Sequence, residues 1–132
     1  MGESAGKSGT IAFEAVVEPA RAARFAESLG LPGDTVPLVF PAFWLFEPET
    51  QALLGGLVGK DHVPIHVGQV FRYAAPLRQG GRYHVTVAGE RTEVRGKENL
   101  LVDITVRDAD GNEVVEARST VLLLPVAAGE GQ

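Results

Sequence analysis

The second half of the chain alternates apolar and polar residues over four long segments. These are VPIHVGQVFRYAAPL (63–77), RYHVTVAGERTEVR (82–95), NLLVDITVRDAD (99–110) and NEVVEARSTVLLLP (112–125). A period of two with many β-branched and aromatic residues predicts strands that each bury one face. The DADGN turn contains Gly111, which can adopt the positive φ of a tight hairpin. Because no helical segment interrupts the four strands, they predict an antiparallel meander.

The first half supplies one further strand and two helical segments. TIAFEAVVE (10–18) alternates like a strand, and PARAARFAESLG (19–30) has helical spacing with Gly30 as a stop. The segment VFPAFWLFEPETQALLGGLVG (39–59) is apolar almost all round, which predicts a helix buried on all sides that breaks and restarts at Pro48. These elements predict an α+β protein with the hot-dog fold, a long curved antiparallel sheet wrapped around one buried apolar helix.

Length and composition exclude several classes of protein. A chain of 132 residues allows one domain, expected over 10–126, with tails at 1–9 and 127–132. The absence of cysteine excludes thiolate nucleophiles and disulfides, and a formal net charge of -5 argues against nucleic-acid binding. No apolar run is long enough for a membrane span and no secretory signal is evident, so we expect a cytoplasmic protein. Of the three histidines, His62 is predicted to be solvated in a loop and His84 to face outward or toward a partner.

The stretch PIHVGQVFRYAAPLRQGGRYHVTV (64–87), together with DADGNEVVEARSTVLLLP (108–125) and ARAARFAESLG (20–30), carries a resemblance. It resembles the MaoC-like hydratase and dehydratase family, especially the N-terminal half or non-catalytic subunit of its two-domain members. The similarity covers roughly residues 10 to 125 and is most specific from His66 to Gly81. It implies reversible addition of water to a trans-2-enoyl thioester on coenzyme A or acyl carrier protein, with no metal and no other cofactor.

Catalytic members of that family carry a loop that reads roughly Gly-Asp-x-Asn-Pro-x-His, and the matching loop here is 33–39. Asp34 matches, but Val36 and Val39 stand where the motif has Asn and His, and valine can neither orient nor deprotonate water. The resemblance leaves Asp34 and, from the neighbouring strand, His66 as candidate catalytic residues. Each also fits a structural role, Asp34 as a turn former and His66 as an ordinary strand residue. The family's His-Gly pair before the buried helix is also missing.

The candidate substrate-binding residues are aromatic or basic. Aromatic side chains around the apolar helix would line an acyl channel or simply form core. From His62 to Gly89 the chain has no Asp or Glu, so its arginines predict a basic strip that either meets coenzyme A phosphates or an acidic carrier protein, or is solvated. The candidates are Phe40, Phe43, Trp44, Phe46, Gln69, Arg72, Tyr73, Arg78 and Arg82.

The resemblance and the open edge of a hot-dog sheet favour an acyl-binding subunit that pairs with a catalytic hot-dog chain. Three alternatives remain open at this point. The chain is a self-sufficient homodimeric hydratase that uses Asp34 and His66, a non-catalytic acyl-thioester binding module, or a hot-dog thioesterase that uses Glu47 or Glu49. The sequence leaves open the acyl length, the choice between coenzyme A and carrier protein, and the identity of the partner.

Overall fold

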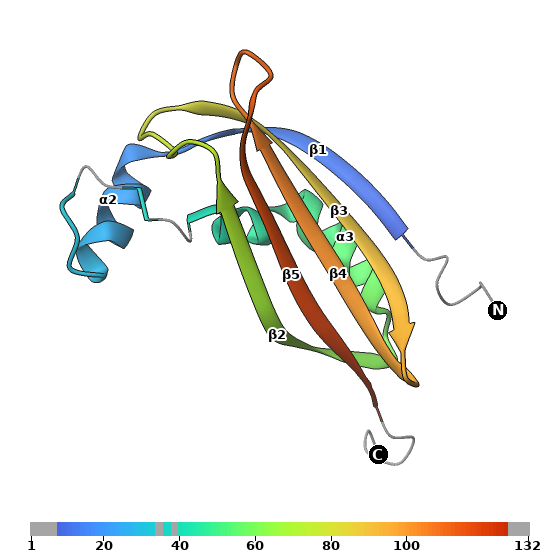
Figure 1. The fold of residues 1–132 in the computed structure, drawn as a ribbon. Coiled ribbons are helices and arrows are strands. Elements are labelled where there is room, and N and C mark those ends of the chain that lie inside the picture. Colours follow the sequence, from blue (N-terminus) through green and yellow to red (C-terminus); the bar gives the residue numbers. More distant parts are fainter. Residues whose placement is uncertain (1–7, 34–35, 38–39, 127–132) are drawn as a thin grey trace.

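The computed structural model of the chain describes residues 8–33, 36–37 and 40–126, without the side chains of residues 42 and 43. The elements in chain order are β1 (Ser8–Val16), α2 (Pro19–Ser28), the 3-10 helix η1 (Phe40–Phe46), α3 (Pro48–Val58), β2 (His62–Tyr73), β3 (Arg82–Val94), β4 (Lys97–Arg107) and β5 (Glu113–Pro125) (Figure 1). The first strand begins at Ser8, so it includes two residues of the expected N-terminal tail. The rest of that tail and residues 127–132 lie outside the described residues.

The strands form a single antiparallel sheet in the order β1-β3-β4-β5-β2 (Figure 1). Consecutive strands β3, β4 and β5 form the predicted meander, and Gly111 adopts the expected positive φ of 85° in the turn before β5. The prediction that all four strands are consecutive neighbours is wrong for β2, which pairs with β5 at the edge. The eight-residue connection 74–81 is too long for a tight hairpin, and it leaves β2 and β3 separated by two strands.

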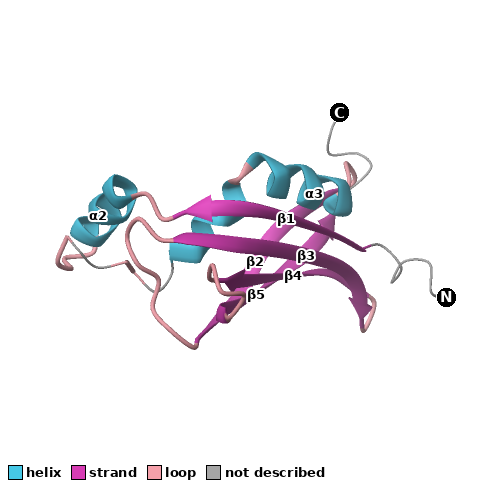
Figure 2. Ribbon diagram, turned by 90° about the horizontal axis from the view of Figure 1, so that it is seen from above, coloured by secondary structure: helices cyan, strands magenta, loops and turns pink. Residues whose placement is uncertain are grey.

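The core lies between α3 and one face of the sheet, which we call the inner face (Figure 2). Side chains that are directly paired across neighbouring strands lie on the same face, so the register defines the inner face of every strand. The inner-facing residues of β3, β4 and β5 that are buried include Tyr83, Val85, Val87, Leu100, Val102, Ile104, Val106, Val115, Ala117 and Leu123. This alternation is the one that the sequence predicts.

The apolar helix is less buried than the sequence predicts. It begins at Pro48 as expected, and the residues before it form η1. Within α3 only Thr50 and Leu57 are buried, whereas Gly55 and Gly56 are exposed. The prediction of burial on all sides is therefore wrong for the single chain. The physical reason is that the sheet curves around one side of α3, which packs mainly against β1 and β3.

The short helix α2 lies beyond one end of the sheet and away from α3 in both views (Figures 1 and 2). It begins with Pro19 and is followed by Gly30 at a φ of 76°, as the sequence predicts. Among the described residues, neither this helix nor α3 is long and apolar enough to cross a bilayer.

Candidate functional site

Strand β2 lies at an edge of the sheet, and its inner face is only partly covered. His66 pairs with Val121 and Gln69 with Ser119, and a register shift lies between His66 and Gly68. This bulge places both His66 and Gln69 on the inner face, because Ser119 and Val121 are two residues apart on β5. His66 is exposed and Gln69 is half-buried. We call His66, Gln69, Phe71 and Tyr73 the β2 inner face.

Of the two predicted catalytic residues, only His66 lies in the described part of the structure. His66 makes no hydrogen bond or ion pair in the described part of the chain. Asp34 lies outside the described residues, so the pair is not tested. Val36 packs against the core, which puts an apolar contact where the resembled motif has Asn. Gln79 donates from Nε2 to the carbonyl oxygen of Gly33 at 2.7 Å, and so joins the start of this loop to the connection before β3.

The predicted aromatic residues do not form one lining. Phe40 and Trp44 are buried, and their rings meet edge to face with centroids 5.8 Å apart at 86°. Phe46 is 72% exposed, and the side chain of Phe43 is outside the described residues. Trp44 also lines a cavity of about 240 Å³ together with Phe13 and the end of β1. Trp44 is therefore both a core residue and a part of the cavity wall.

Charged side chains also line this cavity. Glu14, Glu18 and Glu47 line it together with Arg21. Glu47, one of the thioesterase candidates, is the N-cap residue of α3, and the other candidate, Glu49, is exposed in its first turn. Among the described residues, no group of three or more His, Asp or Glu side chains is arranged to hold a metal ion.

The predicted basic residues are spread over distant parts of the structure. Arg72 lies on the outer face of β2, with Nη1 3.8 Å from Glu116 Oε1, and is about 14 Å from β3 across two intervening strands. Arg82 begins β3, and Arg78 lies in the connection before it and donates its main-chain N–H to the Tyr83 hydroxyl at 3.0 Å. Arg72 is thus separated from the other two arginines, and the sequence window forms no single continuous strip.

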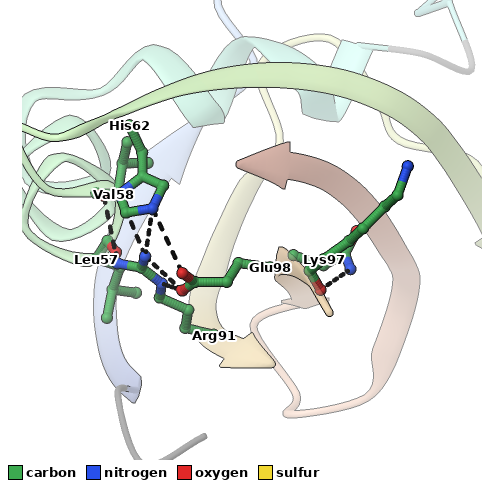
Figure 3. Close-up of polar contacts among 7 residues, drawn as sticks. Leu57, Val58, His62, Arg91, Lys97 and Glu98 are labelled. Carbon is green, nitrogen blue, oxygen red and sulfur yellow. Dashed lines mark hydrogen bonds and ion pairs between the residues drawn. The ribbon is translucent and has the colours of Figure 1, made fainter. Parts of the chain in front are cut away.

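A network of polar side chains lies at the C-terminal end of α3 (Figure 3). Arg91 is 6% exposed and donates from Nε to Glu98 Oε1 at 2.6 Å and from Nη1 to the Leu57 carbonyl oxygen at 3.0 Å. The His62 ring lies against it, with Nε2 3.2 Å from Arg91 Nη2 and 3.4 Å from Glu98 Oε2. The prediction that His62 is a solvated loop residue is therefore wrong. His84 does face outward as predicted, with Nδ1 2.7 Å from Glu14 Oε2.

Two residues of the inner face carry signals that the sequence interpretation missed. Arg91 follows Tyr83, Val85, Val87 and Gly89 at an inward position of β3, so its charge within an apolar series is the signal. Ser119 stands in the same way among the inward-facing apolar residues of β5. Its Oγ and the Gln69 Nε2 opposite are buried without a hydrogen-bond partner in the described structure, as is Thr50 Oγ1 on α3.

Tyr73 is the one residue of the β2 inner face with a large change in proton affinity. It is half-buried at the end of β2. Burial raises the pKa of Tyr73 to about 12, because the phenolate is poorly solvated there. The phenol is therefore a weaker acid than a solvated tyrosine and stays protonated at physiological pH.

No protein-family model and no curated protein sequence matches the chain. Similar solved structures include the HadBC 3R-hydroxyacyl-ACP dehydratase complex of Mycobacterium tuberculosis, at 16% identity and a TM-score of 0.70 over 88% of this chain and 96% of that chain. A hot-dog-like protein from Thermanaerovibrio acidaminovorans matches at 14% identity and a TM-score of 0.68, over 94% of this chain and 87% of that chain. A MaoC-like dehydratase matches at 20% identity and a TM-score of 0.69, over 96% of this chain and 43% of the length of that dehydratase.

These similarities and the sheet with α3 on its inner face establish the fold. The chain has the hot-dog fold, as the sequence predicts. The solved structures that resemble it include MaoC-like dehydratases, and the chain spans less than half the length of the one compared above.

Proposed function

We propose that the chain is the acyl-chain-binding subunit of a hot-dog enoyl-thioester hydratase or 3-hydroxyacyl-thioester dehydratase. A second hot-dog subunit supplies the acid and base that move the proton and the water. The substrate is an acyl group carried by coenzyme A or acyl carrier protein. The likeness to the HadBC dehydratase complex supports this proposal. So does the valine at the position of the motif's Asn, since Val36 can perform no acid-base chemistry.

The open edge of β2 is the observation that carries the proposal. Val63, Ile65, Val67 and Val70 are each between 41% and 59% exposed on this strand. Arg72 is its one charged residue apart from histidine. Edge strands of monomers are usually protected by charge, because an exposed apolar edge invites pairing with another chain. A partner strand along β2 would extend the sheet and bring the second subunit beside the β2 inner face, where an acyl chain would then lie between the subunits.

Charges placed on this edge should prevent subunit assembly. Ile65→Lys combined with Val67→Lys changes two exposed side chains and should leave the subunit folded. The complex that the wild-type chain forms should dissociate, with the apparent molecular mass falling to that of one subunit at micromolar concentration. Analytical ultracentrifugation measures this directly. The control is Val94→Lys, which adds one lysine at a 56% exposed valine at the end of β3 and should leave assembly unchanged.

Activity should require the second subunit. The purified chain should hydrate trans-2-octenoyl-CoA at a negligible rate, and the complex with the hot-dog chain that co-purifies with it should be active. Loss of the enoyl absorbance follows the reaction, and a mass measurement of the complex identifies the partner. Robust activity of the lone chain would contradict the accessory role.

The exposed His66 beside the open edge favours one second candidate, a self-sufficient homodimer. In that case the activity of the lone chain would disappear in His66→Ala and in Asp34→Asn. Release of free thiol that depends on Glu47 or Glu49 would instead identify a thioesterase. A chain that is inactive in every combination, yet is protected from heat by acyl-CoA, would be a binding module.

A further inference from the structure

Gln69 and Ser119 form a pair of unsatisfied polar groups in the mostly apolar inner face. They lie directly opposite each other on β2 and β5, so their Cβ atoms are about 5 Å apart. Ser119 is 2% exposed, and neither its Oγ nor Gln69 Nε2 has a hydrogen-bond partner in the part of the chain that the structure describes. The two groups are therefore held side by side without bonding to each other.

A buried polar group without a partner destabilises a folded chain, and an apolar side chain of similar size would avoid the penalty. Alanine would fit at the position of Ser119, because it differs from serine only in lacking the hydroxyl. The preceding inward-facing residue of β5 is already an alanine, Ala117. Positions that break a local rule of stability in this way are expected at functional sites. Gln69 also lies on the surface that the proposed function assigns to the acyl group.

We propose that Gln69 and Ser119 bind an oxygen atom of the acyl group, either the thioester carbonyl or the 3-hydroxyl. This inference rests on the proposed function and names the polar subsite within it. The Gln69 amide and the Ser119 hydroxyl are both neutral donors, and one carbonyl or hydroxyl oxygen has the two lone pairs to accept from both. Neutral donors suit a neutral oxygen, whereas the phosphates of coenzyme A call for basic side chains.

Of the two residues, Gln69 lies on the edge strand and is the one nearer the open side of the sheet. Gln69 is half-buried, and its terminal amide rotates about a broad torsion, so a small movement turns the donor toward the β2 inner face. Phe71, the next inward-facing residue of β2, is half-buried and offers apolar contact for the carbon chain beyond the oxygen. The arrangement combines one polar anchor with an apolar surface, as small-molecule sites usually do.

Three ligands with the same eight-carbon chain test this inference. They are octanoyl-CoA, (R)-3-hydroxyoctanoyl-CoA and the thioether S-octyl-CoA, which lacks both oxygens. Calorimetric binding to the full chain, in the assembly that it forms in solution, should give at least one oxygenated ligand an affinity about tenfold above that of the thioether. Gln69→Met and Ser119→Ala should each abolish that preference and leave thioether binding unchanged. The ligand whose advantage is lost identifies the oxygen.

The matched control is Thr120→Val, which removes the neighbouring hydroxyl on the outer face of β5 and should keep the preference. Without ligand, Gln69→Met and Ser119→Ala should melt at or above the wild-type temperature, because neither loses a hydrogen bond. Variants that keep the tenfold preference would overturn the inference. So would a fall of several degrees in melting temperature with unchanged affinities, since the pair would then have a structural partner. Wild-type protein that binds none of the three ligands would contradict the proposed function itself.

Discussion

Replacing Arg91 with methionine should lower the free energy of unfolding by about 3 kcal/mol. Arg91 is almost fully buried and joins Glu98 on β4 to the last-turn carbonyls of Leu57 and Val58 on α3. Methionine keeps the apolar stem of the side chain. It leaves the Glu98 carboxylate without its buried partner, and the end of α3 loses a donor that no other described side chain supplies. Denaturant unfolding followed by circular dichroism measures the loss.

Arg118→Met is the matched control for this prediction. Arg118 forms the same kind of two-point contact with Asp103, at 2.7 Å from Nε and 2.9 Å from Nη2, but both side chains lie on the exposed outer face. Exposed ion pairs contribute little to stability, so this variant should melt almost at the wild-type temperature. Similar losses in the two variants would show that burial of Arg91 does not set its contribution. Adding Glu98→Leu to Arg91→Met should recover part of the loss, because the carboxylate that has lost its arginine partner is then gone.

The sheet could be predicted from the sequence because its strands obey a strict period of two. Leu100, Val102, Ile104 and Val106 face inward on β4 as their spacing requires. The position of β2 could not be predicted in the same way, because alternation gives the faces of a strand and not its neighbours. The exposure of α3 could not be predicted from the sequence either. Its apolar composition shows that the helix must be covered, and it does not show whether this chain or another covers it.

The arrangement of the candidate site depends on features that the sequence pattern hides. Alternation alone would place residues 66 and 69 on opposite faces of β2, and only the bulge at Val67 brings His66 and Gln69 to the same face. His62, Arg91 and Glu98 come from three different strands, so their contact follows from the three-dimensional packing. In both places the warning signal is a polar residue at an inward position of an apolar strand.

The open edge of β2 and the half-covered helix α3 have a common explanation. A single hot-dog sheet curves around one side of its helix, so α3 and the β2 inner face are left open together. The close packing of α3 on β3 therefore fixes the position of the helix that the described part of the chain places beside the proposed acyl site. Gly89 is the residue of β3 that permits this packing. A Cβ atom at Gly89 would lie 2.6 Å from Leu57 Cδ1 and 3.6 Å from Leu54 Cδ2.

Gly89→Val should accordingly lower the free energy of unfolding by about 2 kcal/mol, because the buried Leu57 side chain must move to admit the new side chain and the packing of α3 on β3 must adjust. Thermal unfolding of the purified variant measures this effect. Gly55→Ala is the matched control, since a Cβ at Gly55 meets no atom within 4 Å and the residue lies in the exposed part of α3. Removing a glycine from the interior of a helix should raise stability by about 0.5–1 kcal/mol. If Gly89→Val matched Gly55→Ala in stability, the close approach of α3 to β3 would be contradicted, and with it the placement of the helix beside the β2 inner face.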